Sequence, residues 1–118
     1  MHEPLEKMRS LLRLGMTSEE LKAILRQENY RFRYFKAGEN ETPYDEQYRL
    51  SGVDLSGRYK AYSPEVEWDQ GQVITTSTVR LACYMNHDDE AIRIDLDTQV
   101  ETVESRSPES GGGIYPQK

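Results

Sequence analysis

Hydrophobic residues near the N-terminus recur every three or four positions, which is the spacing of one face of an α-helix. The two sets are Leu5, Met8, Leu11 and Leu12, followed by Leu21, Ile24 and Leu25. This pattern predicts two short helices, the second ending near residues 28–29. Both are shorter than the roughly 12–15 residues at which an isolated helix becomes marginally stable in water. They therefore need an apolar surface to pack on.

The segment between these helices carries the signals of a tight turn. Gly15 suits the left-handed position that closes a helix. Thr17 and Glu20 have the spacing of a capping box, in which the side chain of each residue binds the backbone N–H of the other. Met16 and Leu21 occupy the positions of a hydrophobic staple. The sequence therefore predicts a helix–turn–helix unit.

After this unit, apolar and polar residues alternate, which is typical of half-buried strands. The predicted strands cover residues 30–35, 58–62, 72–85, 91–96 and 99–105. The last three form an antiparallel meander, with turns at 86–89 and 97–98. Residues 37–57 contain several glycines and acids and are interpreted as a long loop that could hold a short strand at 47–50.

The order of elements predicts an α+β fold: an N-terminal helix–turn–helix packed on one face of an antiparallel sheet of about four strands. The length of 118 residues fits one domain, assigned to residues 1–107. Residues 108–118 are rich in Gly, Pro and Ser and are predicted to be a disordered tail.

The net charge of −6 disfavours nucleic acid as a partner, because phosphates attract basic surfaces. Arg31 and Arg33 nevertheless alternate with aromatic residues, which predicts a strand with a basic outer face. That face is either simply solvated or meets an acidic protein, with nucleic acid as the least favoured partner. The first residues lack the apolar run of a signal peptide, and no segment reaches the roughly 20 apolar residues that cross a bilayer. A cytoplasmic chain is expected, or a periplasmic one if a leader was removed.

The residues that carry chemistry do not form a recognisable catalytic, cofactor or metal site. Cys83 is the single cysteine and alternates with apolar residues, which predicts a buried thiol that acts as a small hydrophobe. His87 and the acids at 88–90 are interpreted as a polar hairpin tip. Glu65, Glu67 and Asp69 are interpreted as the solvent-facing side of a strand. Asp95 and Asp97 begin a pattern like a calcium loop, but Val100 stands where that loop needs glycine.

The strongest binding signal lies in the aromatic residues of the middle of the chain. Tyrosine and tryptophan combine large area with a polar tip and are enriched where proteins bind proteins. The predicted partner-binding residues are Trp68, Tyr48, Tyr44, Tyr59 and Tyr62. Trp68 is either a core residue beneath the long loop or an exposed anchor for a partner.

The segment from Leu12 to Leu25, with Gly15-Met16-Thr17 at its centre, resembles the opening of BamE-type (SmpA/OmlA) small lipoproteins. That family is similar in turn to the repeat of β-lactamase inhibitor protein. The resemblance implies a helix–turn–helix followed by strands, and non-catalytic protein binding. Two features depart from the family: residues 26–29 lack its Gly-x-Pro turn, and no lipid-carrying cysteine is present. The outer-membrane anchor is therefore not carried over.

Three functions remain open from the sequence. The first is a small non-catalytic protein-binding module, without cofactor, that uses its sheet face and the aromatic residues. The second is an immunity or inhibitor protein that blocks a toxin or enzyme, since an acidic surface suits a basic target. The third is a small α+β enzyme, which requires an ionisable residue such as Asp or His in a pocket between helices and sheet.

Overall fold

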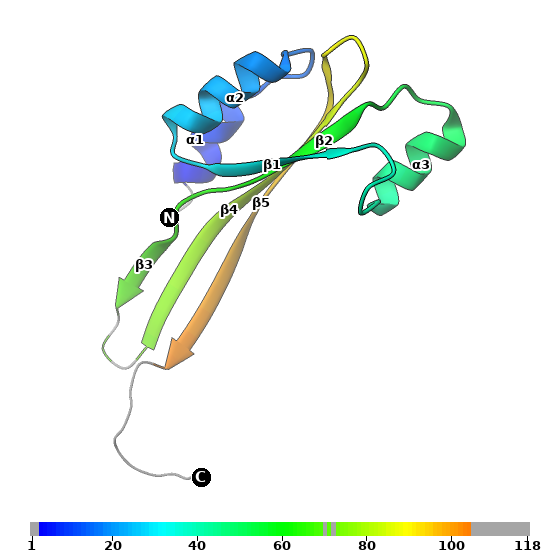
Figure 1. The fold of residues 1–118 in the computed structure, drawn as a ribbon. Coiled ribbons are helices and arrows are strands. Elements are labelled where there is room, and N and C mark those ends of the chain that lie inside the picture. Colours follow the sequence, from blue (N-terminus) through cyan, green and yellow to red (C-terminus); the bar gives the residue numbers. More distant parts are fainter. Residues whose placement is uncertain (1–2, 70, 72, 105–118) are drawn as a thin grey trace, which may run out of the picture.

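The computed structural model of the chain describes residues 3–69, 71 and 73–104. Within these residues the fold is α+β, with three helices and a five-stranded antiparallel sheet (Figure 1). In chain order the elements are α1 (Glu3–Leu11), α2 (Ser18–Gln27), β1 (Arg31–Lys36), α3 (Pro43–Ser51), β2 (Gly57–Tyr62), β3 (Val66–Asp69), β4 (Val73–Met85) and β5 (Ala91–Glu104). The predicted fold class is confirmed. The tail predicted at 108–118 lies outside the described residues.

The turn between α1 and α2 has the predicted geometry. Gly15 adopts a φ of +88°, in the left-handed region. The Thr17 side chain accepts from the Glu20 N–H at 3.2 Å, while the Glu20 carboxylate accepts from the Thr17 N–H at 2.9 Å. Met16 and Leu21 are both fully buried. The capping box therefore fixes the start of α2, and apolar burial holds the turn against the sheet.

This turn also bonds to the sheet through its backbone. The Gly15 N–H donates to the Ala91 carbonyl at 2.8 Å, and the Ala91 N–H donates to the Met16 carbonyl at 2.9 Å. The Ser18 N–H adds a bond of 3.2 Å to the Asp89 carboxylate on the β4–β5 turn. The helix pair is thus anchored at the first residue of β5.

The core lies between this helix pair and one face of the sheet. Alternate residues of β2 and β4 point into it, because side chains alternate along a strand. The sheet contributes Tyr59, Ala61, Val79, Leu81 and Cys83, and the helices contribute Met8, Leu12, Leu21 and Leu25. The predicted helical stripes therefore pack as expected.

The sheet is built around β4. β5 pairs with one edge of β4 along its whole length, and β2 and β3 follow one another along the other edge. β1 pairs with the outer edge of β2. The predicted turn at 97–98 is wrong: β5 is one continuous strand from Ala91 to Glu104. Asp97 instead binds Arg80 across the strand pair, and the β-branched Thr98 lies opposite Val79.

The long loop predicted over residues 37–57 is also wrong, because it contains α3. Thr42 and Asp45 form a second capping box, Pro43 occupies the first turn, and Gly52 ends the helix with a φ of +73°. No strand forms at 47–50, which lies inside the helix. α3 lacks an apolar stripe, since its one buried residue is Asp45. The hydrophobic pattern alone therefore gave no sign of it.

β3 and the adjoining ends of β4 and β5 extend beyond the helices (Figure 1). We define this part, residues 66–69, 73–77 and 99–104, as the arm. Val66, Val100 and Val103 are exposed on it. Within the described residues, no helix is long and apolar enough to cross a membrane.

Candidate functional site

The sheet face opposite the core, here called the open face, is not covered by α1 and α2. The strand register places residues from four strands side by side on it. One row is Arg31, Tyr62, Arg80 and Asp97; the next is Arg33, Lys60, Ala82 and Asp95; the third is Phe35, Arg58, Tyr84 and Arg93. This face is polar and charged where the other is apolar.

α3 covers the third row through an ion pair. Arg58 and Asp45 are 2% and 1% exposed, and Arg58 Nη1 lies 2.6 Å from Asp45 Oδ2. The same guanidinium donates to the carbonyls of Glu39 and Asn40, at 3.3 and 2.6 Å. It also lies over the Phe35 ring, 4.9 Å from its centroid. Both charged groups are buried and face each other, so this end of the open face is structural.

Two predicted binding residues belong to this cover. Tyr44 and Tyr48 lie edge-on to the Tyr84 ring, with centroids 6.2 and 5.9 Å apart. The Tyr84 hydroxyl shares a hydrogen bond of 2.9 Å with Thr42, and Arg93 lies 3.5 Å from the centroid of Tyr44. Both tyrosines therefore help to hold α3 on the sheet, although Tyr44 remains 38% exposed.

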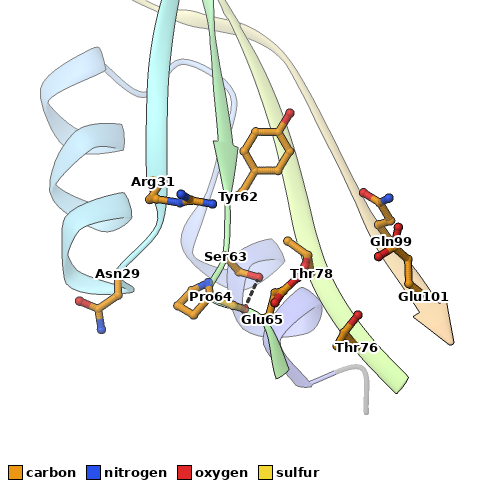
Figure 2. A pocket seen from close by; sticks show the side chains of 10 residues that line it. All are labelled: Asn29, Arg31, Tyr62, Ser63, Pro64, Glu65, Thr76, Thr78, Gln99 and Glu101. Carbon is orange, nitrogen blue, oxygen red and sulfur yellow. Dashed lines mark hydrogen bonds between the residues drawn. The ribbon is translucent and has the colours of Figure 1, made fainter. Parts of the chain in front are cut away.

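Beyond α3, the open face is hollowed into a groove of about 610 Å³ (Figure 2). Four strands and the β2–β3 connection line it. Its principal side chains are Arg31, Tyr62, Thr76, Thr78, Gln99 and Glu101. Figure 2 shows Arg31 and Tyr62 on adjacent strands, with the threonines and the β5 residues along the floor and far side. This mixture of donors and acceptors suits a polar ligand surface.

The connection beside the groove is held in place by Ser63. Its hydroxyl donates to the Pro64 carbonyl at 2.9 Å and accepts from the Val79 N–H at 2.8 Å. The Ser63 N–H donates in turn to the Val79 carbonyl at 2.9 Å. The groove wall is therefore tied to the central strand.

Charge is unevenly distributed across the open face. Arg80 forms two bonds to Asp97, at 2.9 and 2.7 Å, and Arg93 binds Asp95 at 3.0 Å. Among the described residues, no carboxylate forms an ion pair with Arg31, Arg33 or Lys60. The β1–β2 side of the open face thus carries uncompensated positive charge in a chain whose net charge is −6.

The other predicted binding residues are divided between the two faces. Tyr62 lines the groove and is 37% exposed. Tyr59 points into the core and is 9% exposed. Trp68 is half-buried on β3 and shares the helix-side face with its partner Thr75. The five aromatic residues therefore do not form one patch, and only Tyr62 belongs to the groove.

The residues missed by the sequence reasoning are those that the register brings beside Tyr62. Arg31 was recognised as part of a basic strand face, but Lys60, Thr78 and Gln99 had no signal of their own. Alternation assigns each of them to a face. It does not say which strand lies next to which.

Reactive groups lie elsewhere in the described structure. Cys83 is fully buried, and burial raises the pKa of its thiol to about 12, which disfavours the thiolate. His87 pairs with Asp54 on the surface of the β4–β5 turn. Across residues 3–69, 71 and 73–104, no group of three or more His, Cys, Asp and Glu could hold a metal ion.

Comparisons of the chain with protein-family models, with curated proteins and with solved structures found no match. The resemblance of residues 12–25 to BamE-type lipoproteins therefore stays a prediction, and the class that the structure defines is a small α+β domain.

Proposed function

We propose that this chain is a small non-catalytic protein-binding module, whose partner binds in the groove of the open face. The observation that carries the proposal is a cationic group that α3 leaves uncovered. Arg31 and Tyr62 line the groove, and Arg33 and Lys60 lie beside them in the next row of the open face. Arginine and tyrosine are enriched among residues that dominate interface energies. Cations without an ion pair in an acidic chain favour a partner that supplies carboxylates.

The partner surface is an acidic, hydrogen-bonding segment. Thr76, Thr78 and Gln99 offer donors and acceptors along the floor of the groove. A segment that brings carboxylates to Arg31 and Lys60 replaces hydration by charge-assisted hydrogen bonds. Tyr62 supplies a ring to pack against and a hydroxyl to bind.

An immunity or inhibitor role is a second candidate, favoured by the acidic side of the same face. Glu65 and Glu101 also line the groove, and Glu67 lies opposite Thr76 in the strand register. A basic enzyme would contact these acids rather than the arginines. Variants that reverse the charge of these acids, compared with variants that reverse the charge of the cations, distinguish the two candidate functions.

The proposal is tested by photo-crosslinking in cells that make the protein. A benzoylphenylalanine at position 62 is compared with one at position 14, because Leu14 is 64% exposed on the helix side. We expect a protein adduct from position 62 that Arg31→Glu with Lys60→Glu abolishes. The matched control is Lys7→Glu with Arg9→Glu, which changes the net charge equally on α1.

Each outcome decides the proposal. Loss of the adduct with the open-face pair but not with the α1 pair supports it. An adduct that is equally strong from position 14, or that survives charge reversal of Arg31 and Lys60, overturns it. Loss of the adduct only when Glu65 and Glu101 are changed to Lys favours the immunity or inhibitor candidate. Circular dichroism of each variant checks that it is folded.

A further inference from the structure

The outer edge of β5 carries backbone groups that β4 does not bind. Ser63 lies on the β2 side of β4 and forms hydrogen bonds with both the N–H and the C=O of Val79. Partners in an antiparallel pair alternate between hydrogen-bonded and non-bonded positions. Thr98 lies opposite Val79, so its N–H and C=O turn away from β4.

Because bonded and non-bonded positions alternate, every second residue of β5 also turns its backbone groups away from β4. The residues whose backbone groups face outward are Ile94, Leu96, Thr98, Val100 and Thr102. Among the described residues, β4 is the one strand that pairs with β5, and the α1–α2 turn reaches its outer edge at Ala91 alone. Figure 1 shows β5 as the outer strand of the arm. The chain thus presents a long edge whose backbone groups no other described strand binds, although α1 lies beside β5 near Ile94 and Leu96.

This edge lacks two common protections against pairing, although it carries charged residues. Natural edge strands are often shortened, or interrupted by Lys or Pro. β5 has 14 residues and contains neither Lys nor Pro. Val100 and Val103 are 58% and 61% exposed on opposite faces of the arm. A strand added to this edge would bond the backbone groups and cover both valines.

The charges on β5 restrict which strand can be added. Asp95, Asp97 and Glu101 share the open face, and like charges directly opposite one another destabilise a strand pair. Two copies of β5 that pair antiparallel are related by a two-fold axis at one residue. The axis can pass through any residue from 95 to 101. At each of these positions except Val100, two acids from the two copies lie directly opposite each other.

The register centred on Val100 is complementary to itself. It pairs Gln99 with Glu101, Thr98 with Thr102, and Asp97 with Val103, while the two copies of Val100 meet on the axis. Such an interface closes as a two-fold dimer, since the same surface serves both partners.

We propose that the free edge of β5 binds a second copy of this chain, in the antiparallel register centred on Val100, to form a ten-stranded continuous sheet across two protomers. The proposal concerns the sheet edge and does not rest on the function proposed for the open face. Screening by salt is expected to strengthen the dimer, because each protomer carries a net charge of −6.

The oligomeric state of the full chain tests the proposal. Sedimentation velocity is expected to give a concentration-dependent species of twice the 13.7 kDa chain mass. Val100→Pro removes an N–H that faces outward and is not used by β4, so it is expected to abolish the dimer in a folded protein. The control is Val66→Ser, since it alters an exposed valine of β3, which pairs with the edge of β4 opposite β5.

Substitution of Gln99 tests the register without disturbing the backbone. Gln99→Lys places a positive charge opposite Glu101 twice in the dimer and is expected to tighten it by about threefold or more. Gln99→Glu places like charges there and is expected to weaken it by a similar factor. A chain that is monomeric at all attainable concentrations, a dimer that survives Val100→Pro, or equal dimerisation of the two Gln99 variants overturns the proposal.

Discussion

α2 and α3 begin in the same way and are held on the sheet by opposite means. Each starts with a threonine whose side chain forms a capping box three residues on. α2 then buries Leu21 and Leu25 in the core, whereas the one buried side chain of α3 is Asp45. A capping signal in the sequence therefore predicts where a helix begins, but not how the helix packs on the sheet. The attachment of α2 is apolar, whereas that of α3 combines a buried ion pair with aromatic contacts to Tyr84.

Removing the carboxylate of α3 is expected to have the largest effect. Asp45→Ala leaves Arg58 buried without its partner, which costs about 3–5 kcal/mol of the free energy of unfolding. Urea denaturation followed by circular dichroism measures this loss. A loss below about 1 kcal/mol would mean that the Arg58 charge is stabilised without the carboxylate.

The paired apolar replacement sharpens this prediction. Asp45 Oδ1 and Arg58 Nε are buried with no hydrogen-bond partner in the described structure, so the ion pair is incompletely satisfied. Asp45→Leu combined with Arg58→Met removes the unpaired charge, but also the cap on the Thr42 N–H and the donors to the Glu39 and Asn40 carbonyls. It is expected to recover part of the loss caused by Asp45→Ala. The double variant also serves as the control that separates lost charge pairing from lost packing.

Breaking the attachment of α2 is expected to cost slightly less. Leu25→Ala removes a fully buried side chain and leaves a cavity, which destabilises by about 2–5 kcal/mol. Leu14→Ala is the matched control, because Leu14 is 64% exposed and should change stability by about 0.5 kcal/mol or less. Equal losses for the two variants in urea unfolding would contradict the assignment of the core.

The two capping threonines are expected to differ by a smaller amount. Thr17→Ala removes a cap and should cost about 1 kcal/mol. Thr42→Ala removes a cap and also the partner of the Tyr84 hydroxyl, so a larger loss is expected. Thermal or urea unfolding of both variants measures the difference. A greater loss for Thr17→Ala would show that the Tyr84 bond contributes little.

The smallest effect is expected at the β4–β5 turn. Hydrogen bonds from the His87 side chain and backbone lower the pKa of Asp54 below its ordinary value of 3.8. Because the folded-state pKa is depressed, the stabilising effect is present above pH 3.8 and is lost as the pH falls through the lowered value. NMR titration should show the Asp54 pKa rising in His87→Ala. An unchanged value would remove His87 as the cause.

The helix–turn–helix could be predicted because two signals agree there. Thr17 and Glu20 cap a segment whose apolar residues also recur at helical spacing. At α3 the cap is present without the spacing, and Pro43 and Gly52 favoured a loop. In β5, Asp97 suggested a turn because its partner, Arg80, is distant in sequence and becomes visible only through the strand register.

The candidate site was predictable only in part for the same reason. The alternation around Arg31 and Arg33 predicted a basic outer face, and both residues lie on the open face. Whether a cation on this face forms an ion pair depends on which carboxylate the neighbouring strand places beside it. Arg80 is neutralised by Asp97 and Arg31 is not, and sequence spacing does not distinguish them.

The docking of the α1–α2 turn on the start of β5 has a consequence for the order of folding. The bond between Ser18 and Asp89 joins positions 71 residues apart, and closing so long a loop is entropically costly until other structure shortens it. The β4–β5 hairpin needs only its own short turn. We therefore expect the hairpin to form early and the N-terminal helices to arrive late, so that mutations in the turn at Gly15 accelerate unfolding more than they slow refolding.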